Sequence, residues 1–151
     1  MISLRSILLL VTLATSAGSV VAEGKQDHQC VDSWEHEERS RIDFSYVRSL
    51  TQLEQCVLFA GNKFLNAERL SDWLAFNDFN LSPITIIPSR AMKINYHQDG
   101  DGVRLNAFIM REDIPLRLGL IDRFVVHNLA LAVVMNSEGV PIRVQATFTR
   151  T

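Results

Sequence analysis

The last part of the chain alternates apolar and polar residues around a turn-forming segment, and this pattern constrains the fold more than any other feature. Residues 124–135 form a long apolar run, residues 136–139 (NSEG) have turn composition, and alternate residues over 140–148 are apolar. A turn at 137–138 places Val133 opposite Ile142 and keeps the apolar residues on one face. The sequence therefore predicts an antiparallel hairpin, with 124–135 in the centre of a sheet because this run is apolar on both faces.

An earlier segment, 97–102 (HQDGDG), lies between two stretches with the same alternation. Apolar residues alternate with polar ones over 92–96 and again over 103–110. A calcium loop of the EF-hand type that begins at His97 would end at Phe108, where the ion needs a carboxylate. We therefore expect a hairpin turn at Gly100-Asp101, which pairs Tyr96 with Leu105.

Two stretches upstream repeat apolar residues at helical spacing. Thr51 and Glu54 have the spacing of a capping box, and the pattern that follows predicts a helix over about 50–60. Asn66 can cap a second helix, which ends at Asn77 and the asparagine and proline residues after it.

This order of elements predicts an α+β fold. We expect two N-terminal helices packed on one face of a four- to five-stranded antiparallel sheet made of two hairpins. The segment 112–123 fits either a strand or a short helical turn, because alternating leucines follow an Asp and a Pro.

Residues 1–22 have the pattern of a signal peptide. Arg5 precedes an apolar stretch over 7–14, and Val20-Val21-Ala22 ends in the small residues that a signal peptidase accepts. The apolar stretch is under half of the roughly 20 residues that a membrane-spanning helix needs, so a membrane anchor is the weaker alternative. We expect cleavage after Ala22, a flexible lead-in over 23–29, one globular domain over 30–151, and a periplasmic or extracellular location.

Cys30 and Cys56 are the two cysteines of the chain. In an oxidising compartment such a pair usually forms a disulfide, and its spacing differs from that of redox Cys-x-x-Cys motifs and zinc ligand pairs. We predict a structural disulfide.

Charge is distributed unevenly along the chain. Residues 23–80 carry 11 acidic and 6 basic side chains, whereas 81–151 carry 6 acidic and 8 basic ones. The net charge of the chain is −2, which argues against nucleic acid or an anionic membrane as the partner.

Motifs of common enzymes and metal sites are missing from the sequence. His36 begins a segment like the zinc-protease motif, but Ser40 replaces the second histidine, and no phosphate-binding glycine loop or nucleophile elbow is present. His127 is the weak catalytic candidate, because strand alternation places it on the apolar face near a strand end. We expect no metal and no cofactor.

Basic side chains recur on the predicted polar faces of the strands. We take Lys93, Arg104, Arg143 and the neighbouring Phe108 as candidate binding residues for an acidic protein. The sequence thus favours a small exported protein that binds another protein without catalysis, such as an inhibitor, an immunity protein or an envelope-assembly partner. The alternative is a small-molecule-binding or enzymatic α+β cone with a pocket near His127.

Overall fold

The structure is a computed structural model that describes residues 30–31, 39–116 and 126–150. The described residues form three α-helices and a five-stranded antiparallel sheet, which confirms the predicted α+β class. The predicted signal peptide and the lead-in lie outside the described residues, as does His36.

The sheet has the strand order β1-β3-β4-β5, and β2 also pairs with β3. Its strands are β1 (Asn80–Leu81), β2 (Thr85–Ile87), β3 (Gly102–Met110), β4 (Val126–Met135) and β5 (Pro141–Arg150). Because β1 and β2 both lie along β3, they form one edge of the sheet and β5 forms the other. The central position predicted for residues 124–135 is therefore correct over the described part, β4.

The β4–β5 hairpin is confirmed, but its register differs from the prediction by two residues. Val133 faces Val144 instead of Ile142, and a register irregularity occurs between Val134 and Met135. The turn is wider than predicted because the Asn136 side chain accepts hydrogen bonds from the backbone N–H groups of Glu138 and Val140. A shift of two residues leaves each side chain on its predicted face.

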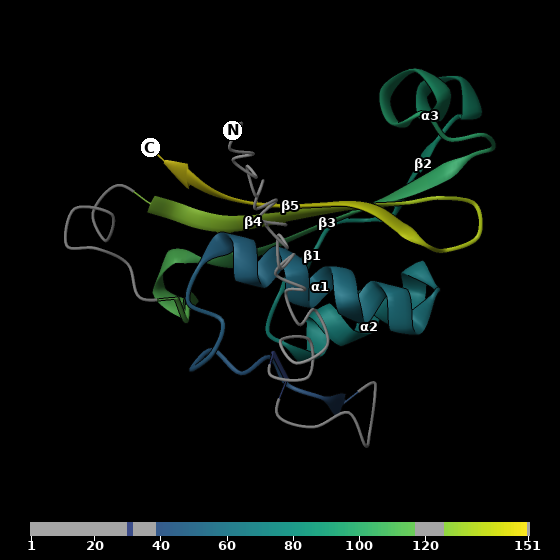
Figure 1. The fold of residues 1–151 in the computed structure, drawn as a ribbon. Helices are drawn as coiled ribbons and strands as arrows, with labels where there is room; N and C mark the ends of the chain where they lie inside the picture. Colours follow the sequence, from purple (N-terminus) through teal and green to yellow (C-terminus); the bar gives the residue numbers. More distant parts are fainter. Residues whose placement is uncertain (1–29, 32–38, 117–125, 151) are drawn as a thin grey trace, which may run out of the picture.

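Helices α1 (Leu50–Phe64) and α2 (Ala67–Phe76) cover one face of the sheet, as predicted (Figure 1). Their apolar residues and the sheet residues facing them form one buried core. The main contributors from the two helices are Leu53, Val57, Ala60, Phe64, Leu70, Trp73 and Leu74. Those from the sheet are Leu105, Ile109, Leu129, Leu131 and Val133.

The start of α1 is set by a residue other than the one the capping pattern suggested. Ser49 is the N-cap and accepts a hydrogen bond from the N–H of Gln52. Glu54 accepts instead from the backbone N–H of Ala146 on β5, at 2.7 Å. The helix also continues past its predicted end to Phe64, and Leu65 ends it in the left-handed conformation.

The predicted strand over 92–96 is wrong, because these residues belong to helix α3 (Ser89–Tyr96). The strand position beside β3 is taken by β2, whose Thr85 pairs with Arg104. β2 has the β-branched sequence Thr-Ile-Ile, which favours a strand. Asp101 of the expected turn accepts a hydrogen bond at 2.7 Å from the N–H of Ser89, the first residue of α3, and so satisfies one of the N–H groups that have no partner within the helix.

Helix α3 lies on the side of the sheet opposite α1 and α2 (Figure 1). Met92 of α3 is fully buried, and its side chain occupies the space where a side chain on Gly102 would project. A glycine at the start of β3 thus allows α3 to pack on this end of the sheet. The ambiguous segment after β3 begins with a 3-10 turn, η3 (Arg111–Asp113), and residues 117–125 lie outside the described part.

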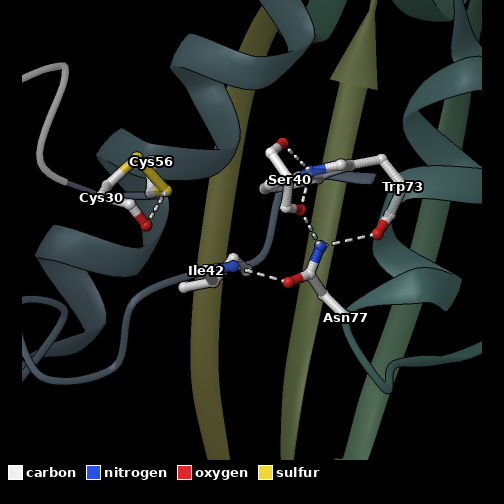
Figure 2. The surroundings of a disulfide bond; sticks show 6 residues. All are labelled: Cys30, Ser40, Ile42, Cys56, Trp73 and Asn77. Carbon is white, nitrogen blue, oxygen red and sulfur yellow. Dashed lines mark hydrogen bonds between the residues drawn. A yellow bond between two sulfur atoms is a disulfide. The ribbon is translucent and has the colours of Figure 1, made fainter. Parts of the chain in front are cut away.

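The described residues before α1, 30–31 and 39–49, are here called the N-terminal arm. The predicted disulfide between Cys30 and Cys56 is confirmed and connects this arm to α1 (Figure 2). The arm also contacts the C-terminal end of α2, where buried Asn77 accepts from the N–H of Ile42 and donates to the carbonyls of Ser40 and Trp73. The indole N–H of Trp73 donates to Ser40 as well.

Candidate functional site

The face of the sheet opposite α1 and α2, here called the open face, carries most of the predicted binding residues. Residues paired across an antiparallel sheet project to the same side, so the register groups the open face into rows. The four rows from β3 through β4 to β5 are Arg104-Val134-Arg143, Asn106-Ala132-Gln145, Phe108-Ala130-Thr147 and Met110-Asn128-Thr149.

A groove of about 410 Å³ opens on this face. Its floor follows the centre of β4, where Ala130 and Ala132 are the smallest side chains of their rows. Larger side chains on β3 and β5 form the walls. The lining of the groove includes Arg104, Asn106, Phe108, Ala130, Ala132 and Gln145. The volume lies within the usual range of ligand clefts, roughly 300–1,000 Å³.

Two similar arginine–amide pairs stand on opposite sides of β4. The Nε–H of Arg104 donates to the side-chain oxygen of Asn106 at 3.0 Å, and an Nη2–H of Arg143 donates to the side-chain oxygen of Gln145 at 3.3 Å. Arg143 is not in the groove lining, but its bond to Gln145 brings its guanidinium to the groove rim. Both cations therefore extend from the Val134 row toward the Ala132 row.

The four rows of the open face carry charged side chains of one sign only. None of its four rows contains an acidic side chain, and no carboxylate among the described residues forms an ion pair with Arg104 or Arg143. Both arginine side chains are exposed. The face thus presents unneutralised positive charge, with amide, hydroxyl and apolar groups around it.

Lys93 does not belong to this surface in the way the alternation predicted. It lies on helix α3 and forms an ion pair with Asp99 at 3.5 Å, with both side chains largely exposed. The structure thus places Arg104, Phe108 and Arg143 on one face of the sheet and puts Lys93 on a separate element.

The expected position of His127 on the apolar face is wrong. A register shift between Val126 and Asn128 interrupts the alternation, so Val126 is buried while His127 is exposed. His127 does not line the groove. The sequence pattern gave no indication of the bulge, since Val126 and Leu129, which flank His127 and Asn128, are both apolar and both suit a buried position.

The sequence pattern did not single out Ala130 and Ala132, which form the groove floor. Ala130 and Ala132 alternate with Leu129, Leu131 and Val133, and this alternation of small and large apolar residues was the available signal. Small side chains on one face of a central strand leave space there when their cross-strand neighbours are larger.

Among the described residues, no group of three or more His, Cys, Asp or Glu side chains is placed to hold a metal ion. No helix in the described ranges has the length and apolar character needed to cross a membrane. No family model, curated protein or solved structure matches this chain.

Proposed function

We propose that this chain is an exported, non-catalytic binding protein whose open face binds an acidic region of another protein. The observation that carries the proposal is the pair of exposed arginines beside a groove, on a face with no acidic side chain in its four rows. Complementary charge of this kind favours an acidic partner and repels basic ones.

Export rests on two features that agree. The sequence of residues 1–22 has the pattern of a signal peptide, and the Cys30–Cys56 disulfide is compatible with an oxidising compartment. The mass of the chain recovered from a secreting host tests this part. Cleavage after Ala22 gives an N-terminal Glu23, whereas retention of residues 1–22 would contradict it.

Binding through this face is better supported than the alternative of a pocket between the helices and the sheet. The side chains that meet there, including Leu53, Leu70 and Leu129, have no exposed surface. His127, the candidate catalytic residue of the alternative, is exposed at a strand end. A filled interior offers no room for a substrate beside these residues.

Affinity capture tests the proposal. The oxidised protein is immobilised and exposed to extracellular and envelope extract of the source cells at moderate salt, beside the double variant Arg104→Glu/Arg143→Glu. We expect a stoichiometric acidic protein whose recovery falls at least about tenfold with the variant, a change of ~1.4 kcal/mol in binding free energy.

The matched control is Arg90→Glu, which reverses an exposed arginine on α3, outside the four rows. It should retain the captured protein. A partner lost equally with the control and the double variant would indicate a general charge effect and would overturn the assignment to the open face. Absence of any stoichiometric partner would contradict the binding role.

A further inference from the structure

We infer that the groove recognises a carboxylate side chain of its acidic partner between Arg104 and Arg143, above Ala132. The inference rests on the proposed function and specifies its chemistry. Arg104 and Arg143 both pair with Val134, so their Cα atoms stand two strand spacings apart, about 10 Å. Their bonds to Asn106 and Gln145 direct both guanidinium groups toward the row of Ala132.

Each guanidinium keeps N–H donors for a ligand after it has donated a hydrogen bond to the side-chain amide beside it. Arg104 uses only Nε–H for Asn106, which leaves both Nη groups, and Arg143 uses an Nη2–H for Gln145. Planar arginine donors match the two oxygens of a carboxylate. The hydrogen bonds to the side-chain amides also hold the two arginines in place, so less side-chain freedom is lost when a ligand binds.

A carboxylate suits this site better than a phosphate group. Protein phosphate sites commonly use converging backbone N–H groups at helix N-termini or in glycine-rich loops. β4 lies between β3 and β5, so the backbone of the groove floor is paired on both sides. The groove therefore offers an anion only side-chain donors: the two arginines, with the amide groups of Asn106 and Gln145 beside them.

The groove also defines what accompanies the carboxylate. One row beyond Ala132, about 7 Å along β4, lie Ala130 and the half-buried ring of Phe108. In an extended peptide, side chains two residues apart lie on the same side at this spacing. The favoured ligand is thus an extended segment with an acidic and an apolar side chain two residues apart, as in Glu-Ala-Leu.

Two short peptides test this directly. Acetyl-Glu-Ala-Leu-amide and its neutral counterpart acetyl-Gln-Ala-Leu-amide are titrated into the oxidised protein carrying ¹³C-labelled alanine methyl groups. The methyl signals of Ala130 and Ala132 report the groove floor, and those of buried Ala60 and Ala146 serve as internal references. We expect the acidic peptide to shift the floor signals with a Kd of about 1 mM and the neutral peptide to bind at least about tenfold more weakly.

The double variant Arg104→Gln/Arg143→Gln should lose this difference between the peptides, while Arg90→Gln should keep it. Equal binding of the two peptides, or an unchanged preference in the double variant, would overturn the inference. Stronger shifts of the same signals with inorganic phosphate would also overturn it and assign the site to phosphate. A captured partner that depends on both arginines, together with no peptide preference, would leave the proposed function standing and remove only the carboxylate site.

Discussion

Asn77 shows how one polar residue organises the N-terminal arm. Its side chain is buried, yet both N–H donors and the oxygen are used: the donors bind the carbonyls of Ser40 and Trp73, and the oxygen accepts from Ile42 at 2.7 Å. Ile42 is itself buried against the core. A buried backbone N–H that loses its partner costs about 1–3 kcal/mol, so this side chain holds the arm on α2.

Replacing Asn77 with Ala should lower the free energy of unfolding by about 2 kcal/mol, because the N–H of Ile42 loses its acceptor inside the protein. Urea denaturation monitored by tryptophan fluorescence measures this change. Asn62→Ala, at an exposed position of α1, is the matched control and should stay within about 0.5 kcal/mol of the wild type. Equal stability of the two variants would show that Asn77 does not secure the arm.

Asp43 begins the turn that leads from the arm to α1, and its charged form is favoured there. Hydrogen bonds from the side chain of Ser45, then from the backbone of Ser45 and of Tyr46, lower the pKa of Asp43 from its ordinary value of 3.8. A lowered folded-state pKa means that this stabilisation is complete above pH 3.8 and is lost as the pH falls through the folded-state value.

A carboxylate titration by NMR should therefore give a pKa for Asp43 below 3.8. Ser45→Ala should raise it, because the side-chain hydrogen bond is the largest cause of the shift. Ser137→Ala, an exposed change in the β4–β5 turn, should leave it unaltered. No response to the Ser45 change would contradict this origin of the shift.

At the scale of elements, the sequence predicted what local patterns determine and failed where distant residues decide. The helices α1 and α2 and the β4–β5 hairpin follow from periodicity and turn composition. Residues 92–96 have strand-like alternation, but Asp101 accepts the first N–H of a helix there and Gly102 makes room for Met92. Both interactions connect residues about ten positions apart, and no local pattern records them.

The open face could be predicted only in part for the same reason. Alternation placed Arg104, Phe108 and Arg143 on polar faces correctly, because successive side chains of a strand point to opposite faces whatever the strand pairs with. On β5 the register error of two residues also preserves the side. Alternation failed for Lys93 because that residue lies in a helix, and for His127 because a bulge interrupts the alternation of β4. The arginine–amide pairs depend on side-chain conformations, which periodicity does not specify.

Among the contacts between elements, the disulfide should make the largest single contribution to the free energy of unfolding, since it connects the arm to α1. A sequence separation of 26 residues corresponds to about 3.5 kcal/mol in the chain-entropy description. The double variant Cys30→Ala/Cys56→Ala should lose roughly this amount in urea denaturation. Amide exchange should rise at Ile42 and Asp43 while β4 stays protected.

The control for this prediction is a reducing agent, which should destabilise the wild type and leave the double variant unchanged. Equal sensitivity of both proteins to reduction would show that the loss has another origin.

At the scale of the whole molecule, the two edges of the sheet are protected in different ways from pairing with another chain. One edge consists of the short strands β1 and β2, flanked by Pro83 and Pro88, and short strands with prolines discourage pairing with another chain. The other edge is the ten-residue strand β5. α1 lies against it, and Glu54 accepts the N–H of Ala146, so part of this edge is occupied within the chain.

Removal of this carboxylate should therefore affect association as well as stability. Glu54→Ala frees the N–H of Ala146 at the sheet edge, and we expect a loss of about 1–2 kcal/mol in unfolding free energy and faster amide exchange at Ala146. We also expect more concentration-dependent association than in the wild type, measured by sedimentation. Glu54→Gln keeps a carbonyl acceptor and should show a smaller change in all three, while Gln55→Ala, exposed on the same helix, should show none. Glu54→Ala could instead match the wild type in amide exchange at Ala146 and in sedimentation. α1 alone would then be sufficient to protect this edge, and the carboxylate would have no part in keeping β5 from pairing with another chain.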